Sequence, residues 1–283
     1  MFKFVADEVW AFDSEWVPDA ASGRALYDLP KDMPERDVFQ HMWEQAGASE
    51  EQPQPFLKLV QCRVVSIALV RRFTAYDGTI SVELRSRPKD PDDPASRDEA
   101  AIITGFLDSV GKRKPQLVGY NSQGSDLPIL CQRGVVLGIR AAEYCQRPEK
   151  PWLGKDYFAR GSEWNIDLMY TVGSGGAGRA SLREIASLSG IPAKLDGFDG
   201  SDTPKAWLDG DVAGIVRYNE QDALTTYLVW LRIAHFGGHF TREEYEVEQD
   251  RLRTMLERRA AGPDGDHIAR YLEEWARLSR SSG

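Results

Sequence analysis

Two acidic residues near the amino terminus, Asp13 and Glu15, have the spacing expected of a metal site. They lie near the end of residues 9–16, VWAFDSEW, a segment that is otherwise mostly apolar. Alternate residues of a β-strand share a face, so the two carboxylates are expected to point together. Like charges on a buried strand repel, and their desolvation is costly unless a hard cation with oxygen ligands neutralises them. The alternative is a strand that ends before Asp13 and leaves both acids in water.

Further chemistry-bearing residues follow along the chain. Asn121 and Asp126 come after a short apolar segment, residues 116–120, and Asp126 also suits the cap of the helix that follows. Tyr218 and Asp222 are four residues apart in the most strongly periodic helical segment, so they share one helix face. No arrangement of Ser, His and Asp or of Cys and His suggests covalent catalysis.

The elements that must position these residues can be predicted from periodicity and turn signals. The Asp77-Gly78 pair between two β-rich segments indicates a hairpin. Residues 19–55 are polar and proline-rich, and we interpret them as an insertion with a short helix at 37–45. The expected strands are 9–16, 57–73, 79–85, 116–120 and 164–169, and the expected helices are 95–112, one beginning near 126, 181–189, 211–235, 241–260 and 266–280.

The ordered set of Asp13-x-Glu15, Asn121 with Asp126, and Tyr218-x-x-x-Asp222 resembles the DEDD superfamily of 3′→5′ exonucleases in its tyrosine branch. The chain looks most like the predicted exonucleases related to the proofreading domain of family B DNA polymerases. The resemblance covers residues 5–235, and it includes the supporting matches GYN at 119–121, DLP at 126–128, DLM at 167–169, SL at 181–182, GIP at 190–192 and DALTTYLVWL at 222–231. Two positions bear on the assignment: Ser125 replaces the Phe of many relatives, and Arg217 occupies the position of the histidine branch's His.

The resemblance implies an α/β fold of the RNase H-like (DnaQ-like exonuclease) type, a mixed sheet flanked by helices. The exonuclease domain would span residues 1–235, with 19–55 as the insertion, and a C-terminal helical extension would span 236–283. The implied activity is hydrolysis from the free 3′ end of single-stranded DNA or RNA, releasing nucleoside 5′-monophosphates by a two-metal mechanism. An alternative is a catalytically silent nucleic-acid-binding module of the same fold, which would normally have lost an acid.

The resemblance also implies a role for each site residue. Two Mg²⁺ or Mn²⁺ ions would be bound by four acids, and Tyr218 would orient the attacking water. Asp167 is expected to be structural. The implied metal ligands are Asp13, Glu15, Asp126 and Asp222, and the implied substrate contacts are Asn121, Ser14 and Trp16.

Composition limits the remaining function classes. The net charge of −9 argues against a broad grip on long nucleic acid, which needs many Lys and Arg. No apolar run approaches a membrane span and no secretory signal is visible, so we expect a cytoplasmic protein without membrane contact. The three cysteines, without Cys-x-x-Cys, argue against a disulfide framework and a zinc site.

Two motifs are weak. Residues 173–178 satisfy G-x-G-x-x-G, but no returning strand completes a dinucleotide-binding unit. His235 and His239 are separated by two glycines that would break a metal-binding helix.

Overall fold

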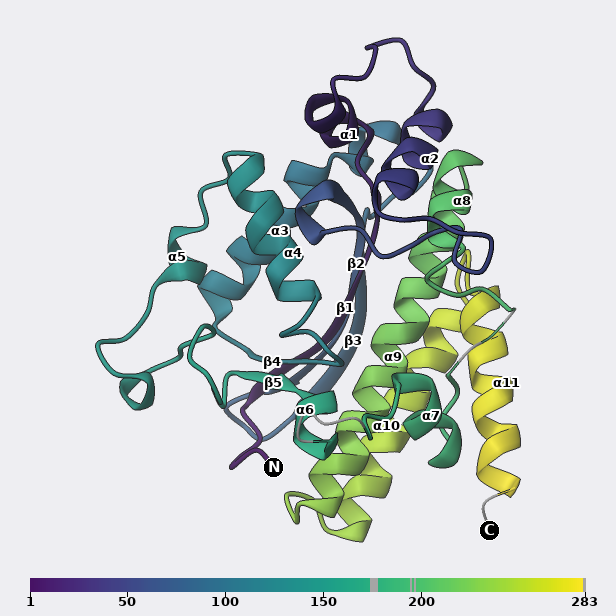
Figure 1. Ribbon diagram of the computed structural model, residues 1–283. Helices are drawn as coiled ribbons and strands as arrows, with labels where there is room; N and C mark the ends of the chain where they lie inside the picture. The colour runs from purple at the N-terminus through teal and green to yellow at the C-terminus, as the bar shows by residue number, and fades with distance from the viewer. Residues whose placement is uncertain (174–177, 194, 196, 282–283) are drawn as a thin grey trace.

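The structure is a computed structural model that describes residues 1–173, 178–193, 195 and 197–281. Its centre is a five-stranded mixed sheet in the order β3-β2-β1-β4-β5 (Figure 1). β2 (Cys62–Thr74) runs antiparallel to its two neighbours, β1 (Glu8–Pro18) and β3 (Ile80–Arg87), whereas β4 (Gln116–Gly119) and β5 (Asn165–Asp167) run parallel to β1. The predicted α/β, RNase H-like architecture is therefore confirmed.

Strand β1 lies in the middle of the sheet, and its two faces contact different helices. Trp10 and Phe12 pack with Phe106 of α3 (Glu99–Arg113), in the same core cluster as α4 (Asp126–Val136). Val9 and Ala11 belong to the second cluster, together with the apolar residues of α9 (Val212–Phe236). A register shift between Glu15 and Trp16 ends the regular alternation of β1. Asp13 and Glu15 of β1 therefore lie on the same face as Val9 and Ala11, toward α9.

Helix α9 is buried on nearly all sides because further helices cover the face that the sheet leaves free (Figure 1). α10 (Arg242–Ala260) and α11 (Asp266–Ser281) share a hydrophobic cluster with α9. Arg72 of β2 forms a buried ion pair with Glu248 of α10 at 2.9 Å. The two predicted C-terminal helices are confirmed, and they are packed on the sheet and on α9.

The expected insertion is folded. Helix α1 (Ala20–Tyr27) was not predicted, whereas α2 (Glu35–Gln45) was. Phe39 and Met42 of α2 are fully buried in the cluster that also holds Trp10. Asp19, which caps α1, pairs with Arg133 at 3.0 Å, and Arg133 pairs with Glu99 at 2.7 Å. The segment is thus tied to the sheet by packing and by a buried ionic network.

Shorter elements complete the chain. The predicted strand at 57–73 begins only at residue 62, because a 3-10 turn (Leu59–Gln61) precedes it. The predicted helix at 95–112 begins at 99, where Asp98 caps it after a second 3-10 turn (Pro94–Arg97). Most of the G-x-G-x-x-G segment, residues 174–177, lies outside the described residues. The remaining helices are α5 (Ala142–Cys145), α6 (Leu168–Gly173), α7 (Leu182–Leu188), α8 (Thr203–Leu208) and the 3-10 turn at Pro151–Leu153.

Within the described residues, no helix combines the length and apolarity that crossing a membrane requires.

Candidate active site

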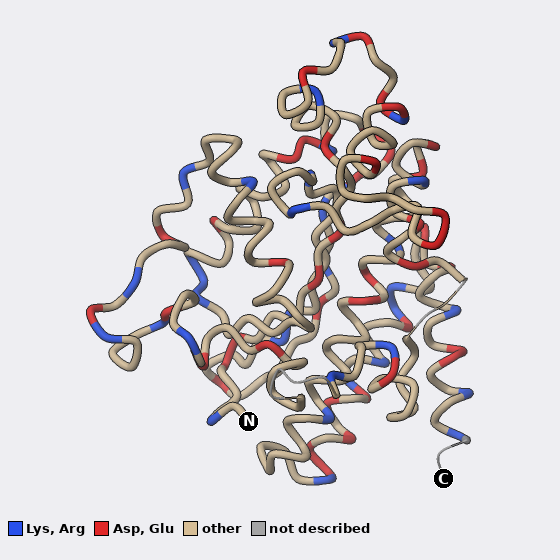
Figure 2. The backbone as a smooth tube through the Cα atoms, in the orientation of Figure 1, with Lys and Arg blue, Asp and Glu red and all other residues tan. Residues whose placement is uncertain are grey.

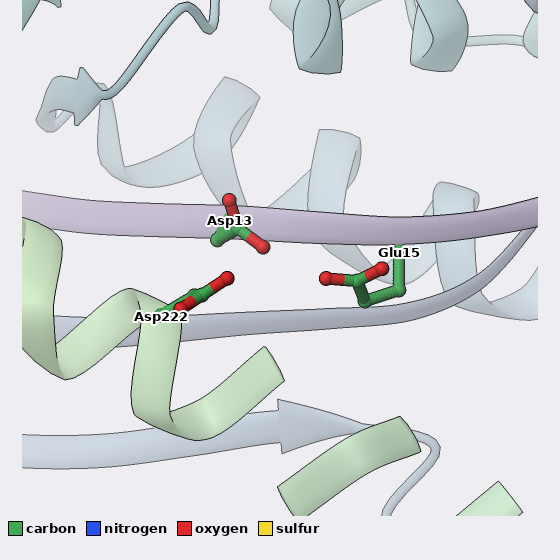
Figure 3. A group of neighbouring side chains, drawn as sticks. All are labelled: Asp13, Glu15 and Asp222. Carbon is green, nitrogen blue, oxygen red and sulfur yellow. The ribbon is translucent and has the colours of Figure 1, made fainter. Parts of the chain in front are cut away.

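Three acidic side chains from two elements meet between the sheet and α9. Asp13 and Glu15 project from the same face of β1, as the strand alternation predicts, and Asp222 projects toward them from α9 (Figure 3). One carboxylate oxygen of each residue lies within 4.8 Å of the other two. Residues more than 200 positions apart in sequence thereby form a compact set of oxygen donors.

The electrostatics of this cluster favour a bound cation. Burial raises the pKa of Asp13 well above its usual value, and the charges of Asp126, Asp222 and Glu15 raise it further. The pKa of Glu15 is raised in the same way, first by burial and then by Asp222. Desolvated carboxylates at this separation repel one another, and a hard divalent ion with oxygen ligands relieves that repulsion. The donor set therefore fits Mg²⁺ or Mn²⁺.

Hydrogen bonds orient two of the three acids. Asn219, which is fully buried, donates from Nδ2 to Asp13 Oδ2 at 2.7 Å. The Ser66 hydroxyl of β2 in turn donates to Asn219 Oδ1 at 2.8 Å. Thr203 of α8 donates to Glu15 Oε2 at 3.2 Å. Neighbours of this kind hold metal ligands in the orientation that binding needs.

These three positioning residues were not predicted. Asn219 was detectable in principle, because it lies three residues before Asp222 and so shares its side of the helix. Ser66 and Thr203 had no such signal, since neither stands in a motif.

Asp126 lies near the cluster but outside the group of three. Its Oδ1 accepts hydrogen bonds from the backbone N–H of Ser14 at 2.9 Å and from the Ser14 hydroxyl at 2.6 Å. Its Oδ2 accepts one from the Ser125 hydroxyl at 3.0 Å. The helix cap is Ser125, and Asp126 is the first helical residue, so the expectation that Asp126 caps α4 is wrong. Ser14, expected at the substrate, here holds Asp126.

Tyr218 lies one turn before Asp222 and hydrogen-bonds its carboxylate. Its ring packs against Phe198 with 5.0 Å between the centroids. Burial, followed by the charges of Asp222, Glu15 and Asp13, raises the pKa of Tyr218 far above its ordinary value. The phenol is therefore protonated at neutral pH and acts as a hydrogen-bond donor.

The loop before α4 is fixed by Asp167. Asp167 Oδ1 accepts from the backbone N–H of Asn121 at 3.0 Å, and Oδ2 accepts from that of Gln123 at 3.0 Å. Asn121 has a positive φ of 61°, which this pair of bonds supports. Asp167 thus has the structural role expected of it, and Asn121 lies half-buried at the turn.

Trp16 lies beyond the acids on β1 and lines a hollow of about 210 Å³ together with Trp43 and Phe56. Its side chain is half-buried, whereas Phe56 is 74% exposed. The structure thus places an aromatic hollow next to the acidic cluster.

The chain is similar to part of a protein of known structure. Among solved structures, the family B DNA polymerase of the hyperthermophilic archaeon Pyrobaculum calidifontis matches with 20% identity and a TM-score of 0.45. The match covers 80% of this chain and 25% of the polymerase chain, so the chain spans about a quarter of that protein's length. No curated protein matches the chain.

The model of one protein family matches residues 54–275, which is most of the chain. The matched range contains Asp126, Tyr218 and Asp222. Asp13 and Glu15 precede this range, but their strand β1 pairs with β2, which lies within it. The chain therefore belongs to the family of predicted 3′→5′ exonucleases related to the exonuclease domain of PolB.

Proposed function

We propose that the protein is a metal-dependent 3′→5′ exonuclease of the tyrosine-containing DEDD type. It would hydrolyse phosphodiester bonds at the free 3′ end of single-stranded DNA or RNA and release nucleoside 5′-monophosphates. The observation that carries this proposal is the meeting of Asp13, Glu15 and Asp222 within 4.8 Å, with Glu15 buried and the other two half-buried, in a member of an exonuclease-related family. All four acids of the motif set are present in the sequence, which supports hydrolysis over a silent binding module.

Asp13, Glu15 and Asp222 would hold the ions, with Asp126 adding negative charge beside them. When bound, two Mg²⁺ or Mn²⁺ ions would lower the pKa of the attacking water and stabilise charge on the attacking and leaving oxygens. The two hydrogen bonds from Ser14 to Asp126 Oδ1 fix that carboxylate in place, and they lower its pKa against the larger raising effect of burial. Asn219 likewise fixes the Asp13 carboxylate in place.

Tyr218 positions the attacking water. A phenol whose pKa is raised above its usual value of about 10 is a poor base at neutral pH, so its contribution is a hydrogen bond rather than proton removal. The bond to Asp222 directs the hydroxyl toward the carboxylate cluster. Asn121 and Trp16 are assigned to the terminal nucleotide.

The test is degradation of single-stranded DNA and RNA oligonucleotides with a free or a chemically blocked 3′ end. Each is incubated with Mg²⁺, Mn²⁺ or EDTA, and products are resolved at single-nucleotide steps. We expect stepwise shortening of open 3′ ends only, and none in EDTA. Asp13→Asn and Asp222→Asn should each lower the rate more than about a hundredfold, beyond the usual effect of residues outside the metal's ligand set.

The matched control is Asp250→Asn, a surface acid of α10 that is 70% exposed in its side chain. It should hydrolyse at the parent rate. Parent rates in both site variants, with all proteins folded by circular dichroism, would refute the two-metal assignment.

A further inference from the structure

A second, basic site lies at the free edge of the sheet. β3 pairs only with β2, and a hollow of about 620 Å³ lies between its C-terminal half, α3 and the end of α10. Trp10, Leu69 and Phe106 contribute to its apolar wall. In the described part of the chain no carboxylate lines this hollow, and its charged wall residues are all cations: Arg85, Arg87, Lys89, Arg113 and Arg259. We call these five residues and the space between them the basic groove.

Two of the five cations have no acid partner. Among the ion pairs of the described residues, none within 4.0 Å involves Arg87 or Lys89. The Arg87 guanidinium lies against Gly105 of α3, where an added Cβ would come within 2.6 Å of its Cζ. A glycine at this helix position therefore leaves the space that the arginine occupies.

The other three cations are only partly neutralised. Arg85 pairs with Glu83, Arg113 with Glu8 at 3.3 Å, and Arg259 with Glu220 at 3.5 Å. Each of the three arginines keeps at least 44% of its side chain exposed. Elsewhere the chain carries both signs interspersed (Figure 2), and its net charge is −9. The basic groove, which is lined by cations and by no carboxylate among the described residues, thus differs from this mixed pattern and favours an anionic ligand.

The position of the basic groove relates it to the acidic cluster. Arg87 pairs with Ile67 of β2, and Ile67 pairs with Ser14 of β1, between the two acids of that strand. Paired residues of a sheet share a face, so Arg87 lies on the face of Ser14, opposite Asp13 and Glu15, and about two strand spacings of 4.8 Å away from β1. Arg85 and Arg87 share one face of β3 about 7 Å apart, so the two guanidinium groups can contact different phosphates of one strand.

We propose that the basic groove binds the phosphodiester backbone of a nucleic acid strand, away from the nucleotide being removed. The ligand class rests on the proposed function, but binding in the groove requires neither metal nor catalysis. A row of cations at this spacing suits a repeating polyanion better than a single phosphate. The groove would hold a part of the strand remote from the 3′ end, because Arg85 and Arg87 lie on the sheet face opposite Asp13 and Asp222.

The experiment measures binding of a 5′-labelled single-stranded 20-mer by fluorescence anisotropy in EDTA, with full-length protein, at several salt concentrations. The variant is Arg85→Gln with Arg87→Gln and Lys89→Gln. The matched control replaces three exposed cations elsewhere by Gln, at Lys3, Arg242 and Arg277, so both proteins carry the same net charge. The side chains of these control residues are 81%, 79% and 60% exposed.

We expect the groove variant to bind about tenfold more weakly or worse at low salt, while the control matches the parent. Three lost phosphate contacts at about 0.7 each should reduce the slope of log K against log salt by about 2. Lys89→Glu alone, at an exposed position that folding does not need, should also weaken binding. Parent-like affinity and slope in the groove variant would overturn the proposal.

Two further outcomes also decide the matter. If polyglutamate of equal charge displaces the oligonucleotide as readily as unlabelled DNA does, the groove accepts any acidic chain and the nucleic acid assignment is wrong. If the groove variant binds normally but self-associates, its cations protect the edge strand from pairing instead. Failure of hydrolysis in the degradation assay with binding still dependent on the groove would refute the proposed function and leave this proposal standing.

Discussion

Asn219 offers a sharp test of how the acidic cluster is held. It is fully buried and forms two hydrogen bonds, donating to Asp13 at 2.7 Å and accepting from Ser66 at 2.8 Å. Asn219→Ala removes the side-chain hydrogen bond that lowers the pKa of Asp13. A hydrogen bond to a charged group contributes about 1.5–3 kcal/mol, equivalent to roughly 10- to 100-fold in an equilibrium constant. Outer residues around metal sites show the same range of effects on affinity.

The assay is a Mg²⁺ titration of hydrolysis, accompanied by calorimetric titration of the metal. We expect Asn219→Ala to raise the half-saturating Mg²⁺ concentration about 10- to 100-fold, with the rate largely recovered at saturation. Ser66→Ala should have a smaller effect of about fivefold, because it removes a bond between neutral groups worth about 1 kcal/mol. The order of the two variants is therefore part of the prediction.

The control is Asn165→Ala, which alters another buried asparagine. Asn165 donates to the backbone carbonyl of Tyr157 at 3.0 Å, on β5 rather than beside the acids. It should lower the free energy of unfolding without moving the Mg²⁺ titration. If Asn219→Ala behaves like this control, Asn219 is a packing residue and the reasoning about Asp13 fails.

Three further predictions concern charge and proton position. In EDTA, the free energy of unfolding should fall as pH rises from 5 to 8, because the raised pKa values of Asp13 and Glu15 let the native state retain protons that the unfolded chain has lost. Urea unfolding should show a slope of about −1.4 kcal/mol per pH unit for each retained proton, and both Mg²⁺ and Asp13→Asn should reduce that slope. A free energy of unfolding that rises over this pH range through these groups would contradict the prediction. Tyr218→Phe should slow hydrolysis about 10- to 100-fold without moving the Mg²⁺ titration, and an unchanged rate would remove the phenol from the mechanism. Glu248→Gln should lower the free energy of unfolding by about 3–5 kcal/mol because it leaves Arg72 buried without its partner, whereas replacing both by Met should restore most of the loss; a neutral single variant in urea unfolding would refute this.

The parts of the site that sequence could predict are those set by local periodicity. Alternation along β1 places Asp13 and Glu15 on one face, and helical spacing places Tyr218 and Asp222 together. Long strands and helices were likewise recognisable, because burial on one or both faces leaves a repeating apolar pattern. The carboxyl-bearing segments had to meet once the strand directions were known.

The remainder depends on contacts between distant segments. Ser66 and Asn219 are 153 positions apart, and the local sequence around either residue does not predict their hydrogen bond. Thr203 lies in a six-residue helix, α8, too short for a periodic signal. A helix cap was the alternative role considered for Asp126, but its hydrogen bonds with Ser14 come from strand β1, 112 residues earlier. Tertiary packing, and not local sequence, determines which residues form these hydrogen bonds.

The C-terminal helices contribute to the site by fixing the rotation of α9. Glu220 lies between Asn219 and Asp222 and accepts hydrogen bonds from Ser86 of β3 at 2.6 Å and His267 of α11 at 2.7 Å. Burial alone would raise the pKa of Glu220, but these hydrogen bonds lower it, so the carboxylate stays ionised. A rotation of α9 that carried Asp222 away from the sheet would break both bonds and leave a charge buried without partners, at a cost of several kcal/mol. The acid of α9 is therefore held in place from the side opposite the sheet as well as from the sheet, which gives α11 a part in the geometry of the site although it supplies no ligand.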